Sequence, residues 1–319
     1  MSTIKHIPAF RRVALVGGSG LMPACFIQAF KHAGDEFEVT ILTRKESLEA
    51  TRQAVSGLPQ FNVVPVDYSD EDMLTEVFSS QQVVISLLTL GGMMSQETLI
   101  RAARAAGVKW FFPSEFGLDI GIPANRELPL MAGKVAVRNA LEEQATKPNG
   151  MAYTYVVTGA FAEMFVNPFN DWDTDNHTVI VPDAGDKGQT KISWIIRQDV
   201  ANYTLAILRR FEQFKNKTAR VSSFTASYAD WIDAFKTVNG VEYTPTYEPL
   251  AVLERRMAAA AAAAAKDPTT VDYKYVADQL HTAMATGRAR LDSVGNKLDS
   301  GALVEVSPTT LTAIVADIR

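Results

Sequence analysis

The sequence predicts an α/β protein in which a doubly wound parallel sheet is followed by a smaller, mainly helical part. Two observations lead to this fold class. Short apolar runs alternate with helix-like stretches from Arg12 to Thr158, which is the order that places parallel strands between covering helices. These runs are also apolar along most of their length, as expected of strands that are covered on both faces.

Six segments are predicted to be strands because they are short and rich in β-branched or aromatic residues. They are Arg12–Val16, Phe37–Leu42, Phe61–Val66, Gln82–Leu88, Trp110–Pro113 and Tyr153–Thr158. Four helices with a periodic apolar face are predicted between them, at Leu21–Ala33, Asp70–Phe78, Gln96–Ala106 and Leu130–Gln144. Residues 160–190 are predicted to be loops with short strands, and helices are expected to dominate from Tyr228 onward.

The composition argues against several classes of protein. The 319 residues carry 31 basic and 36 acidic side chains, a net charge of −5, which argues against direct nucleic-acid binding as the main task. Cys25 is the only cysteine, so no intramolecular disulfide can form and a reducing, cytoplasmic location is expected. The four histidines do not lie at ligand spacing from one another, so no metal site is predicted.

No segment has the length of a membrane helix, which needs roughly 18 consecutive apolar residues. The closest candidate is the alanine run Ala258–Ala265, which is too short. We therefore expect no membrane association. The run itself predicts a stable helix because alanine has the highest helix propensity; a special packing or partner role is the alternative.

A glycine-rich turn between the first strand and the first helix predicts a dinucleotide site. Glycines let the backbone approach a pyrophosphate, and the helix N-terminus offers unpaired amide groups to the anion. Pro23 stands where a third glycine is usual, although proline is tolerated in the first turn of a helix. A plain glycine turn is the alternative. The predicted contact residues are Gly17, Gly18, Ser19, Gly20, Leu21 and Met22.

The residues after the second strand indicate which dinucleotide is bound. An acidic residue there would accept hydrogen bonds from a ribose 2′-hydroxyl and favour NAD, but the sequence has Thr43, Arg44 and Lys45. A guanidinium at this position pairs well with a 2′-phosphate. We therefore predict NADP(H) as the cofactor; the alternative is that Arg44 and Lys45 are ordinary solvated charges.

Lys134 is the predicted catalytic residue. Many short-chain reductases use a Tyr-x-x-x-Lys motif, but Leu130 occupies the tyrosine position here and only the lysine remains. Lys134 can hold the cofactor ribose and carry a proton, because partial burial would bring its pKa toward the working range. Arg138 lies one helical turn further and is predicted to face the same site. A structural surface lysine is the alternative.

Taken together, these motifs resemble the isoflavone reductase-like and NmrA-like branch of atypical short-chain dehydrogenases. The resemblance covers about residues 11–170 and is strongest at 105–117, which reads Ala-Ala-Gly-Val-Lys-Trp-Phe-Phe-Pro-Ser-Glu-Phe-Gly. Val13–Gly20 and the Lys134-x-x-x-Arg138 spacing support it. The Asp-rich loop 170–176 and the long helical tail resemble a fungal-type member.

The resemblance implies an NAD(P)-binding Rossmann fold, cofactor contacts by residues 17–23 and Arg44, and a catalytic role for Lys134 with Arg138 in the same site. It also places Phe116, Phe161 and Met164 near the nicotinamide and the substrate; ordinary core positions are the alternative for these three. We expect an NADP-binding domain over residues 1–160, rejoined by 190–225. Residues 161–189 and 226–319 are expected to form the substrate-binding domain.

The leading functional hypothesis is an NADPH-dependent reductase of the isoflavone reductase-like type. Hydride would pass to an enone, quinone methide or benzylic ether carbon of an aromatic or polyketide-like secondary metabolite. The alternatives are an NADP-binding redox sensor without turnover, and a redox-neutral cyclase or isomerase on the same fold. The oligomeric state is expected to be monomer or homodimer.

Overall fold

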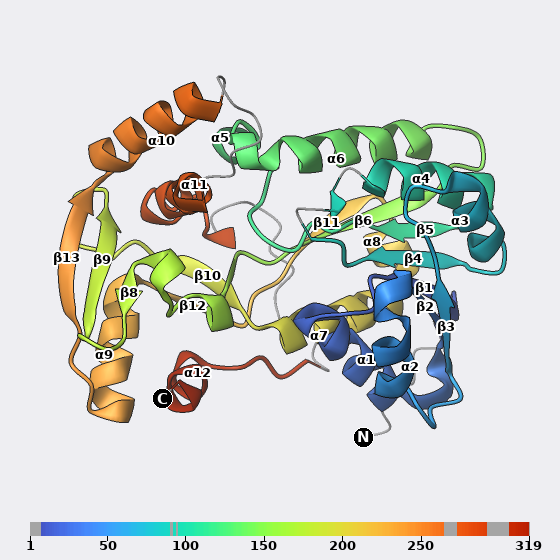
Figure 1. Cartoon of the computed structure of the whole chain (residues 1–319), viewed down its shortest axis with the longest axis horizontal. Helices are drawn as coiled ribbons and strands as arrows, with labels where there is room; N and C mark the ends of the chain where they lie inside the picture. The colour runs from blue at the N-terminus through green and yellow to red at the C-terminus, as the bar shows by residue number, and fades with distance from the viewer. Residues whose placement is uncertain (1–7, 90–91, 94, 265–272, 292–305, 319) are drawn as a thin grey trace.

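The computed structural model of the chain describes residues 8–89, 92–93, 95–264, 273–291 and 306–318. Its centre is a seven-stranded parallel sheet with the order β11-β6-β5-β4-β1-β2-β3 (Figure 1). The strands are β1 (Arg12–Val16), β2 (Glu38–Thr43), β3 (Phe61–Pro65), β4 (Val83–Ser86), β5 (Trp110–Phe112), β6 (Ala152–Val157) and β11 (Lys217–Arg220). The predicted α/β class is confirmed, and all six predicted strands are present.

Helices cover both faces of this sheet, and the strands β1, β4 and β5 are buried along almost their whole length. One face packs on α1 (Leu21–Ala33) and α7 (Arg197–Leu208), which contact each other. The opposite face packs on α3 (Glu71–Phe78), α4 (Ser95–Ala105) and α6 (Ala132–Ala145). The strand order reverses between β1 and β4, so the segments that follow these two strands diverge to opposite faces. In such sheets ligands bind at this switch point.

Two small sheets lie beside the main one. The first has the order β12-β10-β7, with β7 (Ala160–Phe161), β10 (Ile192–Ile195) and β12 (Phe224–Ala226). The second has the order β13-β9-β8, with β8 (Trp172–Asp173), β9 (Thr178–Asp183) and β13 (Thr244–Pro249). Strand β13 lies in the stretch expected to be mainly helical. Its sequence contains two prolines, and because proline has no amide hydrogen to donate to a sheet, the pattern does not predict this edge strand.

An aromatic cluster fills the space between these small sheets and their helices. The ring of Phe165 lies 4.3 Å from that of Trp194 and 5.0 Å from that of Trp231, measured between centroids. The helices of this part of the chain are α9 (Tyr228–Asn239), α10 (Leu250–Ala264), α11 (Tyr273–Ala285) and α12 (Leu311–Asp317). The alanine-rich segment is therefore helical as predicted as far as Ala264; Ala265 lies outside the described residues.

Short elements complete the described chain. They are η1 (Gly34–Glu36), η2 (Lys45–Ser47), α2 (Leu48–Ala54), α5 (Pro123–Arg126), η4 (Pro129–Met131), η5 (Ala162–Met164), η6 (Pro168–Asn170) and α8 (Phe211–Phe214). Among the helices of the described ranges, none is both long and apolar enough to cross a membrane.

Gly159 is the point at which the chain leaves the main sheet for the first small one. Its φ is +75°, and a Cβ there would lie 2.3 Å from the Ser193 carbonyl oxygen of β10. The change Gly159→Ala therefore imposes both an unfavourable backbone conformation and a backbone clash. We expect it to lower the free energy of unfolding by about 2–5 kcal/mol, measured by urea denaturation.

Gly185→Ala is the matched control. Gly185 also has a positive φ, +99°, but no atom lies within 4 Å of the position that a Cβ would take there. Only the backbone penalty of about 1–2 kcal/mol applies at this residue. Equal losses in the two variants would contradict the role assigned to the close contact with β10.

Candidate active site

The turn between β1 and α1 presents backbone amides to the switch point of the sheet. Gly17 and Gly20 have φ values of +104° and +105°, which glycine adopts without strain. The Gly17 amide donates to the Leu42 carbonyl oxygen at 2.9 Å, which holds the turn against the end of β2. The first hydrogen bond of α1 comes from the Ala24 amide to Gly20, so Pro23 costs the helix no hydrogen bond.

A cavity of about 930 Å³, here called the glycine-loop cavity, lies over this turn. Its walls come from the carboxyl ends of β1, β2, β3 and β4, as expected of a ligand site in an open α/β sheet. Arg44 is 61% exposed at its rim, and its Nε lies 3.3 Å from a Glu46 carboxylate oxygen. The lining includes Gly17, Gly18, Ser19, Thr43, Arg44, Lys45, Asp67, Ser69, Leu87, Leu88 and Thr89.

A second cavity of about 380 Å³, here called the apolar cavity, continues from the first. Leu87, Leu88 and Thr89, which follow β4, line both cavities, so one ligand can reach from the first into the second. Most of its walls are aliphatic or aromatic. Further lining residues are Met22, Met93, Ser114, Phe116, Leu118, Lys134, Phe161, Met164, Phe165, Phe169, Asn170, Trp194, Val276, Leu280 and Met284.

Lys134, in the first turn of α6, brings the one cationic side chain to the described wall of the apolar cavity. Its Nζ donates to the Glu115 carbonyl oxygen at 3.0 Å, and the residue is only 9% exposed. Burial lowers the pKa of Lys134 below its ordinary value; the Glu115 carboxylate opposes this shift and Arg138 adds to it. The amine is thus fixed in place and is easier to deprotonate than an exposed lysine.

Arg138 lies behind Lys134 and does not line either cavity in the described part of the chain. Its Nε and Nη2 donate to the same Glu115 carboxylate oxygen at 3.1 and 2.6 Å. Its guanidinium also lies over the Tyr155 ring, 4.3 Å from the centroid. Arg138 was predicted to face the same site as Lys134 and to help bind the cofactor, but the buried Glu115 carboxylate holds its guanidinium. A direct role in cofactor binding stays a prediction.

The chain has relatives among known proteins. The model of the NmrA-like family matches residues 10–291. The chain belongs to the NmrA-like family. It is 31% identical to oxidoreductase aprR of Aspergillus flavus over 241 residues, which span 74% of this chain and 76% of the relative. It is 29% identical to phenylcoumaran benzylic ether reductase POP1 of Populus trichocarpa over 204 residues, spanning 61% of this chain and 63% of the poplar protein.

Two solved structures have the fold of this NmrA-like protein. An isoflavone reductase superposes with a TM-score of 0.77 at 20% identity, covering 98% of this chain and 100% of that one. The structure of AtPrR2 with NADP+ and (+)pinoresinol also has a TM-score of 0.77 at 20% identity, covering 97% and 99%. The family resemblance inferred from the motifs is confirmed, and the named relatives are oxidoreductases.

The structure places most of the predicted site residues around the two cavities. Gly20 lines a neighbouring hollow between α1 and α2, and Leu21 is 67% exposed and lines none of the described cavities. Cys25 is half-buried, and burial raises the pKa of its thiol, which makes it less reactive. The predicted residues that line the two cavities are Gly17, Gly18, Ser19, Arg44, Met22, Phe116, Lys134, Phe161 and Met164.

Sequence reasoning missed two residues of this site. Glu115 lies inside the segment 105–117 that carries the family resemblance, but no role was predicted for it. Nothing in the neighbouring sequence indicates that its carboxylate is buried against Arg138. Asn170 lies in a polar stretch expected to be a loop, yet it is only 6% exposed and lines the apolar cavity. No pattern in the sequence distinguishes it from the neighbouring Asn167.

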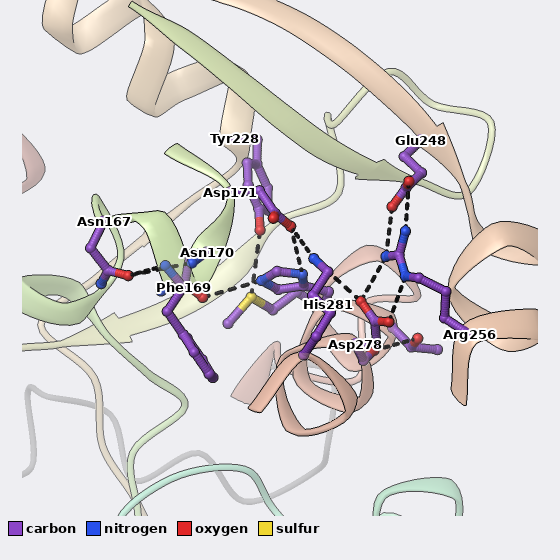
Figure 2. Close-up of polar contacts among 12 residues, drawn as sticks. Asn167, Phe169, Asn170, Asp171, Tyr228, Glu248, Arg256, Asp278 and His281 are labelled. Carbon is purple, nitrogen blue, oxygen red and sulfur yellow. Dashed lines mark hydrogen bonds and ion pairs between the residues drawn. The ribbon is translucent and has the colours of Figure 1, made fainter. Parts of the chain in front are cut away.

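A polar network, buried at His281 and Asp278, lies behind Asn170 in the wall of the apolar cavity, and Figure 2 shows its contacts. His281 of α11 places Nε2 3.1 Å from Asn170 Oδ1 and Nδ1 3.6 Å from an Asp171 carboxylate oxygen. Arg256 of α10 donates to both Asp278 and Glu248, at 2.7–2.8 Å. Burial lowers the pKa of His281 from 6.5 to about 4, against the opposing effect of Asp171.

The lowered pKa of His281 makes stability depend on pH. Between pH 6.5 and about 4 the unfolded chain binds a proton at His281 that the folded chain excludes. The contribution of His281 to the free energy of unfolding is therefore fully present above pH 6.5. As the pH falls toward 4, this contribution is lost by about 1.4 kcal/mol per pH unit. We expect His281→Gln to flatten the fall in unfolding free energy between pH 6.5 and 4.5, measured by urea denaturation.

His32→Gln is the control for this measurement, because His32 is exposed on α1. Its pH dependence should follow that of the unchanged chain. If the unfolding free energy of His281→Gln falls with pH as steeply as that of His32→Gln, burial of the neutral imidazole does not cause the loss of stability in acid.

Proposed function

We propose that this protein is an NADPH-dependent reductase that transfers hydride to an aromatic or polyketide-like secondary metabolite. One observation carries the proposal: the buried amine of Lys134 lies in the wall of an apolar cavity that is continuous with the glycine-loop cavity. This arrangement brings a dinucleotide site, a water-poor substrate site and a proton carrier together. The oxidoreductase names of the relatives support the same conclusion.

The residues of the glycine-loop cavity suit NADP(H). The turn at Gly17 and Gly20 and the unpaired amides at the start of α1 would hold the pyrophosphate. Arg44 and Lys45 would hold the 2′-phosphate, since both line the cavity and no acidic residue precedes them after β2. When bound, the reduced cofactor supplies the hydride. The complex of AtPrR2 with NADP+ supports this assignment.

The chain's own residues handle the proton and exclude water. Lys134 uses one of its hydrogens for the Glu115 carbonyl oxygen, and the others are available to a substrate oxygen. Its lowered pKa brings proton transfer closer to neutral pH. Arg138 acts as a positioning residue, because it fixes Glu115 and thereby the carbonyl that orients Lys134.

The apolar cavity favours an uncharged aromatic substrate. Phe116, Phe161 and Met164 contribute to its wall, which suits a ring better than a charged group. The reducible group would be an enone, a quinone methide or a benzylic ether, and the poplar relative's name supports the last of these. Residues 1–160, rejoined by 190–225, would then bind the cofactor, and residues 161–189 and 226–319 the substrate, in a cytoplasmic protein.

The redox sensor and the redox-neutral cyclase remain the competing functions, and turnover separates them from a reductase. Purified protein is incubated with NADPH and a panel of aromatic enones and benzylic ethers, and NADPH oxidation is followed together with product mass. We expect oxidation matched by a product two mass units heavier than its substrate. NADPH binding without oxidation across the panel would favour the sensor, and an isomeric product without oxidation would favour the cyclase.

Arg44→Ala tests cofactor selectivity. Loss of a charged hydrogen bond to the 2′-phosphate should weaken NADPH binding about 10- to 100-fold and leave NADH binding unchanged. The measurement is a titration of cofactor fluorescence. Arg101→Ala, which removes an exposed arginine of α4 paired with Glu71, is the matched control. Equal affinity of the unchanged protein for the two cofactors would contradict the assignment.

Lys134→Met tests the proton carrier. A methionine fills the same space without an amine, so turnover of a substrate found in the panel should fall by about 100-fold or more. Folding, measured by circular dichroism, should persist, and NADPH should still bind. Lys109→Met, at an exposed position before β5, should leave turnover unchanged. Full activity of Lys134→Met would remove Lys134 from the mechanism.

A further inference from the structure

The polar groups of the apolar cavity are unevenly distributed. Thr89 lines the glycine-loop cavity as well, and Ser114 and Lys134 lie at the segment that follows β5, the strand beside β4. The opposite side is built from β7, η5, η6, β10 and α11. Among the described residues that line this far side, Asn170 supplies the one side-chain amide. The Trp194 indole there already donates to the Ala226 carbonyl oxygen at 2.8 Å.

The orientation of the Asn170 amide follows from its partners. Its Nδ2 lies 2.5 Å from the Met164 carbonyl oxygen, which can only accept a hydrogen bond. The amide nitrogen must therefore face Met164, and Oδ1 faces His281 Nε2 at 3.1 Å. That ring nitrogen must in turn carry the hydrogen. Figure 2 shows His281 directed at Asn170 from α11.

The surrounding contacts hold this arrangement rigid. His281 is 1% exposed, and the neighbouring Asp171 carboxylate accepts a hydrogen bond from Lys274 Nζ at 2.6 Å. Asn167 donates to the same Met164 carbonyl oxygen. The Asn167 side-chain oxygen accepts from the backbone amides of Phe169 and Asn170, at 2.8 and 3.3 Å. The segment from Met164 to Asp171 is thus fixed by its own polar side chains and by α11.

Two hydrogen-bonding positions of the Asn170 amide are left over. In the described chain, Nδ2 donates one hydrogen bond to the Met164 carbonyl oxygen and Oδ1 accepts one from His281. Nδ2 carries a second hydrogen, and Oδ1 has a second lone pair. A polar group this deeply buried favours a ligand that satisfies it and disfavours one that leaves it unpaired. The other described side chains that line this end of the cavity are aliphatic, aromatic or thioether groups.

We propose that Asn170, oriented by His281, is a specificity-determining residue that binds a hydroxyl or carbonyl group of the substrate. The substrate is then an aromatic compound with two polar ends: the reducible group near Lys134 and a second oxygen at the far side. This inference rests on the proposed function, because it assumes that the apolar cavity holds the substrate.

The test compares ligands that differ only in the second oxygen. The pairs are 4-phenylbut-3-en-2-one with its 4-hydroxyphenyl counterpart, and chalcone with the chalcone hydroxylated at the para position of the ring remote from the carbonyl. Dissociation constants are measured by calorimetry with and without NADP+. In at least one pair the hydroxylated member should bind about 3- to 10-fold more tightly, as expected for one hydrogen bond.

The variants assign that preference to the amide. Asn170→Leu should bring the ratio of the two dissociation constants close to one, with Asn170→Ala as the second variant should the first not fold. His281→Leu should reduce the ratio, and His281→Gln, which keeps an N–H donor, should restore most of it. Asn62→Leu, at an exposed position of β3, should leave the ratio unchanged. A variant that weakens the binding of both members of a pair equally leaves the ratio of their dissociation constants unchanged.

The proposal is overturned if the unchanged protein binds neither pair, if it binds both members of each pair equally, or if Asn170→Leu keeps the preference. A structural role of His281 alone would lower both affinities without changing their ratio, and this result would overturn the part assigned to His281. Ligand binding without NADP+ requires no turnover. Failure of the reductase function, seen as no NADPH oxidation, is therefore a separate result.

Discussion

The site depends on the ion pair between the buried Glu115 carboxylate and Arg138. Removing a charged group from water costs several kcal/mol unless a partner compensates it, and Glu115 is 1% exposed. Arg138 supplies the compensation, with two hydrogen bonds to one oxygen. This pairing requires α6 to lie with its first two turns against the segment that follows β5, and in that position Lys134 reaches the Glu115 carbonyl oxygen. This ion pair, together with the apolar packing of α6 on the sheet, sets the position of the amine.

The two cavities differ in the chemistry of their walls because they come from different parts of the fold. The glycine-loop cavity is built by the ends of parallel strands, where backbone amides and polar turn residues gather. The far side of the apolar cavity is built by the small sheets and α11, whose apolar side chains also belong to the aromatic core around Phe165. A polar cavity rich in backbone amides and an apolar cavity therefore adjoin each other.

The sequence predicted what local patterns control. Strands β1 to β6 are short and apolar, and the glycine turn is contiguous, so both were visible without a structure. The contacts between distant residues were not: His281 and Asn170 are 111 positions apart, and no periodicity joins them. Arg138 shows the same limit, since helical spacing placed it near Lys134 while its true partner lies on another segment. Strand β13 was missed because its prolines are typical of loops.

The separation between Asn170 and His281 also bears on the order in which the protein is assembled during synthesis. A ribosome delivers the N-terminal region first, and such regions begin to fold as they emerge. Six of the seven strands of the main sheet lie before residue 158, so the nucleotide half can collapse early. The far wall of the apolar cavity must wait for α11, near the end of translation. Nascent chains of this protein would therefore gain the ability to hold a dinucleotide before they gain a closed chamber for a second molecule.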